Sequence, residues 1–224
     1  MCGRFTLTTP GEELAETLGL ASLAEHSPQY NIAPGQRIAA VRAAGTGPEA
    51  AALKWGLVPG WSKEPRSGYR MINARAETIT EKPAFRTAVR RRRCLIPADG
   101  YYEWQKTGSG KQPWYITLPG HALFTFAGIW ESWQQGDSDT LETCAIVTRA
   151  ANPALAPIHD RMPVLIAAAD RARWLEAPLE ADDIKTMLLE SANDSFETVA
   201  VSTRVNSPRN DDADCIAPLP AAAG

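Results

Sequence analysis

The chain has 224 residues, of which 44% are hydrophobic, with a formal net charge of −3 at pH 7 and four cysteines. This composition excludes a largely disordered chain and predicts one domain over residues 1–224 with a sizeable core. No apolar run approaches transmembrane length and we expect no signal peptide, so the predicted location is cytoplasmic, at the nucleoid in a bacterium. The cysteines form no CxxC pair, so neither a metal site nor a disulfide framework is predicted. We also expect a monomer without a cofactor.

Taken in chain order, hydrophobic patterning predicts many strands and four short helices. The first helix starts at Thr9, a candidate N-cap, with Pro10 at its first position and Glu12 completing a capping box. The other helices are predicted over about 80–93, 170–175 and 182–189. Strands are predicted over 37–41, 51–55, 71–77, 94–97, 101–105, 114–118, 123–130, 142–148 and 196–201. The last residues, 206–224, are rich in Pro, Ala and Asp and predict an irregular tail.

Proline and glycine interrupt two segments, 30–35 and 55–61, which are therefore predicted to be irregular. The second segment carries Trp55 and Trp61 inside a basic region. Aromatic side chains on such a loop can stack on unpaired bases, and Trp61 is the candidate for this contact. Core packing is the commoner use of tryptophan and stays the alternative.

Basic residues are concentrated in the middle of the chain. Thirteen basic and four acidic residues lie between Arg37 and Arg93, a net charge of +9 against −12 for the remainder. Arg86, Arg90 and Arg93 recur at spacings of four and three, which would align them on one face of the predicted helix. Such a face could bind phosphates, with Arg86 and Arg90 as contacts, or could simply be solvated.

Cys2 is the candidate nucleophile. Removal of Met1 would make Cys2 the N-terminal residue, with a thiol of pKa about 8.5 and an α-amine of pKa about 8. An amine and a thiol on adjacent carbons condense with an aldehyde, first to a Schiff base and then to a thiazolidine. The alternative is an incidental cysteine in a frayed terminus.

Three further segments carry polar side chains suited to a site. Asn73, Arg75 and Glu77 alternate, so they would share one face of the strand predicted over 71–77. Glu103 shares a strand face with Tyr101 and Gln105. Its direct neighbours in the sequence, Tyr102 and Trp104, are also aromatic. This apolar setting predicts a raised pKa and proton transfer near neutral pH for Glu103, with an ordinary solvated acid as the alternative.

His159 lies in a polar loop between two prolines, Pro157 and Pro163. Asp160 and Arg161 follow it directly and could set its charge. A lone histidine in a loop is otherwise a common surface residue, so the sequence pattern leaves both interpretations open.

Six blocks in this order resemble the SRAP family, the SOS response-associated peptidase proteins. They are residues 1–5, 30–34, 55–59, 72–77, 98–104 and 158–163. The resemblance implies an α+β fold in which curved antiparallel sheets form a barrel-like core with peripheral helices. It also implies a role in DNA repair, in which Cys2 captures abasic sites of single-stranded DNA as a thiazolidine crosslink that shields the lesion.

The same resemblance implies which residues form the site. Those matching the family's catalytic positions are Cys2, Asn73, Glu103 and His159, and the residues matching DNA-phosphate contacts are Arg4 and Arg75. The family's name suggests another class of activity, a self-processing cysteine peptidase, which is a hydrolase; lyase-type action on the abasic strand is a further expectation. A third interpretation is a module that binds single strands without a covalent step.

Overall fold

The computed structural model describes residues 2–22, 26–108, 110–134, 140–190 and 195–220. Its strands are β1 Phe5–Leu7, β2 Gln29–Ile32, β3 Arg37–Ala44, β4 Gly47–Trp55, β5 Asn73–Arg75, β6 Arg93–Ala98, β7 Gly100–Thr107, β8 Gly110–Thr117, β9 Phe124–Trp133, β10 Leu141–Ala150, β11 Arg161–Pro163, β12 Leu165–Ile166 and β13 Glu197–Ala200. Its α-helices are α1 Gly11–Leu18, α2 Arg86–Arg91, α3 Arg171–Glu176 and α4 Ala181–Leu189. Short 3-10 helices, η1 to η5, span Pro65–Arg70, Pro119–His121, Ala168–Asp170, Thr203–Asn206 and Ala213–Cys215.

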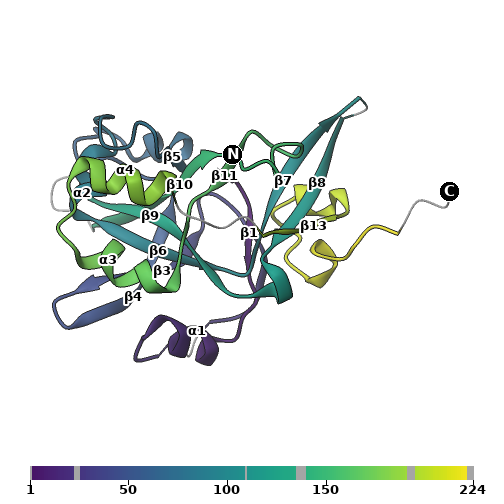
Figure 1. Ribbon diagram of the computed structural model, residues 1–224, viewed down its shortest axis with the longest axis horizontal. Coiled ribbons are helices and arrows are strands. Elements are labelled where there is room, and N and C mark those ends of the chain that lie inside the picture. The colour runs from purple at the N-terminus through teal and green to yellow at the C-terminus, as the bar shows by residue number, and fades with distance from the viewer. Residues whose placement is uncertain (1, 23–25, 109, 135–139, 191–194, 221–224) are drawn as a thin grey trace.

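The strands form two sheets. The smaller has the order β13-β8-β7-β1-β2, and the larger has the order β11-β10-β4-β3-β6-β9-β12, with β5 added on β10. Because β10 pairs with β9 as well as with β4, the strands β10, β4, β3, β6 and β9 close into a ring. The helices lie outside this ring, with α2, α3 and α4 together at one end of the molecule (Figure 1). The predicted α+β fold with a barrel-like core and peripheral helices is confirmed.

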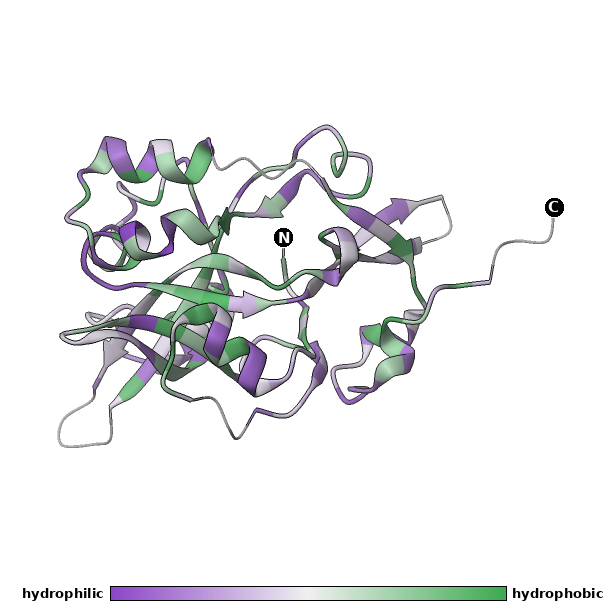
Figure 2. Cartoon of the chain, turned by 60° about the horizontal axis from the view of Figure 1, so that its bottom comes forward, coloured by the Kyte–Doolittle hydropathy of each residue, from purple (hydrophilic) through white to green (hydrophobic). Residues whose placement is uncertain are grey.

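The pairing of β10 departs from a purely antiparallel sheet. It runs antiparallel to β9 and β11 but parallel to β4 and β5. Both β5 and β11 therefore lie beside β10, which brings the segment around residue 73 close to the segment around residue 161. Figure 2 shows hydrophobic segments concentrated on the central strands, and hydrophilic segments alternating with them along the helices.

Several predicted element boundaries are wrong. Thr9 does not cap α1: the helix begins at Gly11, and the Thr9 hydroxyl instead donates to Asp99 Oδ2 at 3.0 Å. The segment predicted to be irregular over 30–35 includes most of β2, because pairing with β1 stabilises an extended chain there. The strand predicted over 71–77 is limited to β5, and turns follow it.

The helix predicted over 80–93 is also too long. Turns occupy the chain up to the start of α2 at Arg86, and Arg93 belongs to β6. Arg93 is buried, and its guanidinium donates to the carbonyls of Val89, Arg90, Trp174 and Ala177. It therefore does not join Arg86 and Arg90 on an exposed face, because four backbone acceptors compensate its burial.

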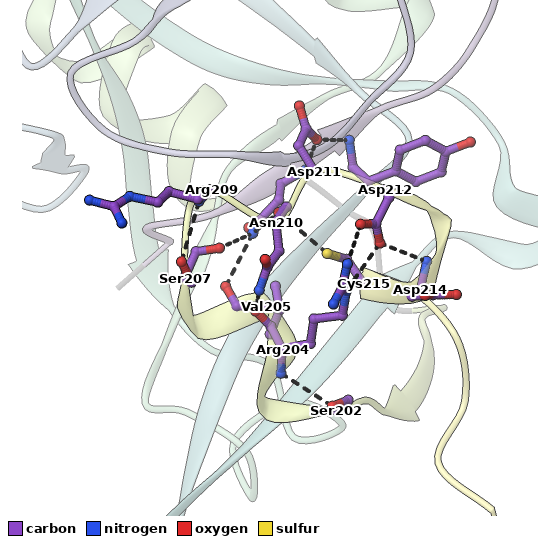
Figure 3. Close-up of polar contacts among 12 residues, drawn as sticks. Ser202, Arg204, Val205, Ser207, Arg209, Asn210, Asp211, Asp212, Asp214 and Cys215 are labelled. Carbon is purple, nitrogen blue, oxygen red and sulfur yellow. Dashed lines mark hydrogen bonds and ion pairs between the residues drawn. The ribbon is translucent and has the colours of Figure 1, made fainter.

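The C-terminal segment is more ordered than the predicted tail. Residues 206–220 pack on the smaller sheet, with η5 and a buried Cys215 (Figure 3). Asp211 Oδ1 accepts hydrogen bonds from the backbone N–H groups of Tyr30 at 2.5 Å and Asn31 at 2.8 Å. Residues 221–224 lie outside the described residues. Polar contacts to β2, which composition does not reveal, order this segment.

Asn31 connects three parts of the chain. Its side-chain oxygen accepts from Arg4 Nη1 at 2.7 Å. Its amide nitrogen donates to carbonyls of the C-terminal segment, those of Val205 at 3.2 Å, Ser207 at 3.0 Å and Asn210 at 2.6 Å. Since Asn31 is 1% exposed, these bonds form in a dry interior, where they hold the N-terminal strand against the end of the chain.

Candidate active site

The N-terminal strand places Cys2 against β7. In the antiparallel pair of β1 and β7, Phe5 lies opposite Tyr101, and the Tyr102 N–H donates to the Arg4 carbonyl at 2.9 Å. Continued by two residues, this register sets Gly3 opposite Glu103. Cys2 itself is fully buried in the main hydrophobic cluster. The residues that the structure describes therefore begin with a thiol held beside β7, while Met1 lies outside them.

Asn73 holds the backbone of Cys2. Its Nδ2 donates to the Cys2 carbonyl oxygen at 2.8 Å. The parallel pairing of β5 with β10, in which Asn73 lies opposite Ile146, sets its position. Asn73 Oδ1 is buried and has no hydrogen-bond partner among the described residues. Next to Cys2, Asn73 thus offers one acceptor that an incoming group could use.

Glu103 and His159 approach each other from β7 and from the loop before β11. Glu103 Oε2 lies 3.9 Å from His159 Nε2. The backbone N–H of Arg161 donates to His159 Nδ1 at 3.0 Å, which assigns the proton of a neutral imidazole to Nε2. Asp160 Oδ1 also lies 3.0 Å from Nδ1, and this contact is attractive only when the imidazole is charged. The Nε2–H of His159 therefore faces the Glu103 carboxyl.

Burial sets the protonation of these groups. Glu103 is 3% exposed, and its burial raises its pKa from 4.5 to about 7, as predicted from its aromatic neighbours. Burial, and then the Glu103 carboxylate, raises the pKa of the Cys2 thiol well above its ordinary range. Burial lowers the pKa of His159. Near neutral pH the site therefore holds a protonated thiol, a neutral imidazole and a carboxyl group that readily gains and loses a proton.

Two sets of contacts hold the His159 loop in place. Gln105 Nε2 donates to the Pro157 carbonyl at 3.0 Å, and Trp114 Nε1 donates to Gln105 Oε1 at 3.0 Å. Arg161 forms a bidentate ion pair with Glu77, at 2.7 and 2.9 Å. These contacts fasten the loop to β7 and to the turn after β5.

Two of these roles differ from the sequence interpretation. Glu77 does not share a strand face with Asn73, since it lies beyond the end of β5 and pairs with Arg161. The role of Gln105 was missed, although its spacing of two from Glu103 placed it on the correct face.

Comparison with known proteins identifies the family of this chain. The family model of the SOS response associated peptidase (SRAP) matches residues 1–208. The chain belongs to the SRAP family. It is 42% identical over 221 residues to the Abasic site processing protein YoaM of Bacillus subtilis, covering 96% of this chain and 97% of that protein. It is 31% identical to the Abasic site processing protein YedK of Escherichia coli, covering 98% and 100% respectively.

Solved structures include the same fold. A crystal structure of a protein from Bacteroides thetaiotaomicron superimposes with a TM-score of 0.85 at 25% identity, covering 97% of this chain and 100% of that one. The predicted membership of the SRAP family is confirmed by the family model and by the sequence relatives.

Around the site of this SRAP chain, the predicted DNA contacts occupy different environments. Trp61 is 68% exposed, whereas Trp55 is buried in the core and donates to the Ile72 carbonyl. Arg4 is half-buried, with its guanidinium bonded to Asn31 and lying 5.9 Å from the Trp104 ring centre.

Arg75, Arg86 and Arg90 are exposed, and the last two line a shallow hollow beside α2. The role of each arginine as a phosphate contact stays a prediction.

Two further findings concern metal binding and membrane insertion. Among the described residues, no group of three His, Cys, Asp or Glu side chains is arranged to hold a metal ion. In the same part of the chain, no helix has both the length and the apolar character needed to span a membrane.

Proposed function

We propose that this protein processes abasic sites by capturing them covalently in single-stranded DNA, through Cys2, as a thiazolidine. The observation that carries the proposal is the arrangement of Cys2 beside Asn73, with Glu103 and His159 3.9 Å apart at the same place. A buried thiol gains reactivity only with a nearby base, and Glu103 has a pKa suited to that task. The names of the relatives, which specify abasic site processing, point to an aldehyde-bearing sugar as the substrate.

The first stage forms an imine. After loss of Met1, the α-amine of Cys2 attacks C1′ of the ring-opened sugar and gives a carbinolamine. Glu103, as a carboxylate, relays the two amine protons in turn: the first converts the alkoxide into the carbinolamine hydroxyl, and the second converts that hydroxyl into the water that leaves. Before this attack, His159 Nε2–H donates a hydrogen bond to the sugar ring oxygen while the ring opens, and the proton of the C1′ hydroxyl passes to that oxygen as the C1′–O bond breaks. Asn73 holds the Cys2 backbone in place for attack.

The second stage closes the ring. Glu103 accepts the proton of the Cys2 thiol, and the sulfur adds to the imine carbon. The electron pair of the C=N bond passes to nitrogen, which takes the proton back from Glu103. One aldehyde and one N-terminal cysteine thus give one thiazolidine and one water, with no other reactant.

Binding of the strand would use the exposed groups around the site. Trp61 offers a surface for stacking on a base, and Arg75, Arg86 and Arg90 are exposed cations for phosphates. Arg4 would contribute a phosphate contact next to Cys2. Because these contacts are electrostatic, affinity should fall steeply with salt.

Denaturing electrophoresis tests the covalent step. A labelled single strand with one uracil is treated with uracil glycosylase, and the untreated strand serves as the control. The expected result is a shifted band with the abasic strand only, whose intact mass equals protein without Met1 plus DNA minus one water. Cys2→Ala should abolish this band. Cys2→Ser and Cys2→Ala both keep an N-terminal amine, so each should still give an imine that borohydride reduction traps.

Two results would contradict the proposal. A crosslink that persists at full yield in Cys2→Ala excludes Cys2 as the nucleophile. Equal, fully reversible binding of the abasic and intact strands would instead support a non-covalent binding module.

The neighbourhood of Cys2 also favours a second candidate, autocatalytic removal of Met1. A thiol acting on its own N-terminal peptide bond would need a base, and Glu103 and His159 are the candidates for that role. Asn73, however, donates to the carbonyl of Cys2, which is one residue beyond the carbonyl to be cleaved. Intact mass of a Glu103→Ala protein tests this candidate: retained Met1 supports autoprocessing, and its removal assigns the cleavage to an aminopeptidase.

A further inference from the structure

Tyr101 is a buried tyrosine whose hydroxyl group none of the roles above uses. Its side chain is fully buried, and its hydroxyl has no hydrogen-bond partner among the described residues. Other buried tyrosines are bonded: the Tyr102 hydroxyl donates to the Tyr30 carbonyl at 2.7 Å, and the Tyr115 hydroxyl lies 3.0 Å from Thr6 Oγ1. An unpartnered buried hydroxyl destabilises the folded state, so its presence calls for a functional reason.

The position of Tyr101 supplies that reason. It lies two residues before Glu103 on β7, so the two side chains share one face of the strand. Across the strand pair it lies opposite Phe5, and it belongs to the same buried cluster as Cys2. The charges of Cys2 and Glu103 both act on its hydroxyl. Tyr101 therefore carries a buried, unpartnered hydroxyl on the strand face of the proposed base and in the same buried cluster as the thiol.

We propose that Tyr101 is a further catalytic residue, whose hydroxyl donates a hydrogen bond to the Cys2 sulfur while that sulfur is a thiolate during ring closure. This inference rests on the proposed thiazolidine chemistry. Glu103 takes the thiol proton, Tyr101 Oη–H donates to the sulfur without losing its own proton, and the C–S bond forms as the C=N pair moves to nitrogen. Nitrogen then recovers the proton from Glu103, so the step balances.

A thiolate needs this donor because its surroundings are apolar. Burial in the main cluster disfavours a negative sulfur, and the neighbouring Glu103 carboxylate disfavours it further. The backbone N–H of Arg4 already acts on the sulfur as one donor. A second donor that is preorganised and otherwise unpartnered stabilises charge where it develops. Its hydroxyl stays protonated, because burial and then the charges of Cys2 and Glu103 raise the pKa of Tyr101.

Tyr101→Phe removes only the hydroxyl and tests the inference directly. Borohydride trapping measures imine formation. The amount of adduct that resists hydrolysis without reduction measures ring closure. We expect imine formation at the wild-type rate, ring closure at least ten-fold slower, and a melting temperature equal to or above that of the wild type. The pH at which the closure rate levels off should rise, because the thiolate loses a donor.

The pH profile must be read with the other titrating groups around the sulfur. Glu103 contributes from β7, the α-amine from Cys2 itself, and His159 with Asp160 from the loop. These groups are unchanged in Tyr101→Phe, so a difference from the wild-type profile reports the hydroxyl.

Tyr102→Phe is the matched control. Tyr102 is adjacent to Tyr101 and points to the opposite face of β7. Its replacement by Phe removes the hydrogen bond to the Tyr30 carbonyl, so this variant should melt at a lower temperature and close the ring at the wild-type rate. Absence of any adduct in the wild-type protein would refute both the proposed function and this inference. A wild-type adduct with equal closure rates in Tyr101→Phe would refute the role of Tyr101 alone. Slower imine formation together with a lower melting temperature would assign Tyr101 a structural role and also refute it.

Discussion

Glu103→Gln should make the protein more stable at alkaline pH and leave its stability nearly unchanged in acid. Glu103 has a folded-state pKa of about 7, against 4.5 in the unfolded chain, and burial is the main cause. Between these two values the folded protein keeps a proton that the unfolded chain has lost. The free energy of unfolding therefore falls as pH rises from about 4.5 to about 7. Glutamine, which is neutral and nearly isosteric, removes this loss.

The size of the effect follows from the two pKa values. At about 1.4 kcal/mol per pH unit, the difference between about 7 and 4.5 corresponds to about 3 kcal/mol above pH 7. This is a large part of the roughly 5–15 kcal/mol that stabilises a typical domain. The Glu103 carboxyl group thus lowers the stability of the folded protein at the position from which it is proposed to transfer protons. Because that transfer is lost in Glu103→Gln, crosslinking should slow by about 10²–10⁴-fold.

Urea unfolding of the wild type and Glu103→Gln at pH 4.5, 6 and 8.5 measures the effect. Glu77→Gln is the control of opposite sign, because the hydrogen bond from Arg161 lowers the pKa of Glu77. That variant should lose stability at neutral pH and approach the wild type in acid. A stability difference for Glu103→Gln that stays constant over this pH range, or a variant less stable at pH 8.5, would refute the reasoning.

Two further substitutions test the surface and the N-terminal strand. Trp61→Ala should weaken binding of an intact single strand about ten-fold in a fluorescence titration, since stacking on one base is worth about 1–3 kcal/mol, while the melting temperature stays unchanged because the side chain is 68% exposed. Unaltered affinity would exclude stacking on Trp61. Asn31→Ala should lower the free energy of unfolding by about 3 kcal/mol, because it removes the four hydrogen bonds that Asn31 forms with Arg4 and three backbone carbonyls in a buried site. A loss below about 1 kcal/mol in urea unfolding would show that these contacts are dispensable.

The closed ring of strands explains how distant residues meet at the site. Parallel pairing of β10 with β5 places Asn73 beside the Cys2 backbone, and antiparallel pairing of β10 with β11 positions the loop that carries His159. β7, from the other sheet, supplies Glu103. The site therefore lies where the two sheets meet, and each catalytic candidate comes from a different element.

Local sequence predicted a substantial part of this protein. Alternation over residues 101–105 placed Glu103 on one strand face among aromatic side chains, and that setting alone predicted the direction of its pKa. The two helices predicted over 170–175 and 182–189 agree with α3 and α4 to within one residue at each end. These features depend on neighbours within about five residues, so they can be read from a single segment.

The tertiary structure decided the rest. Arg93 continued a helical spacing but starts a strand and is buried, because carbonyls from another helix accept its hydrogen bonds. Glu77 alternated with Asn73 but pairs with Arg161, more than 80 residues away. Sequence alone identified Tyr101 as an aromatic on the face of Glu103. Only the packing of β1 against β7 left its hydroxyl buried without a partner near Cys2, because such contacts depend on strand registers that no local pattern encodes.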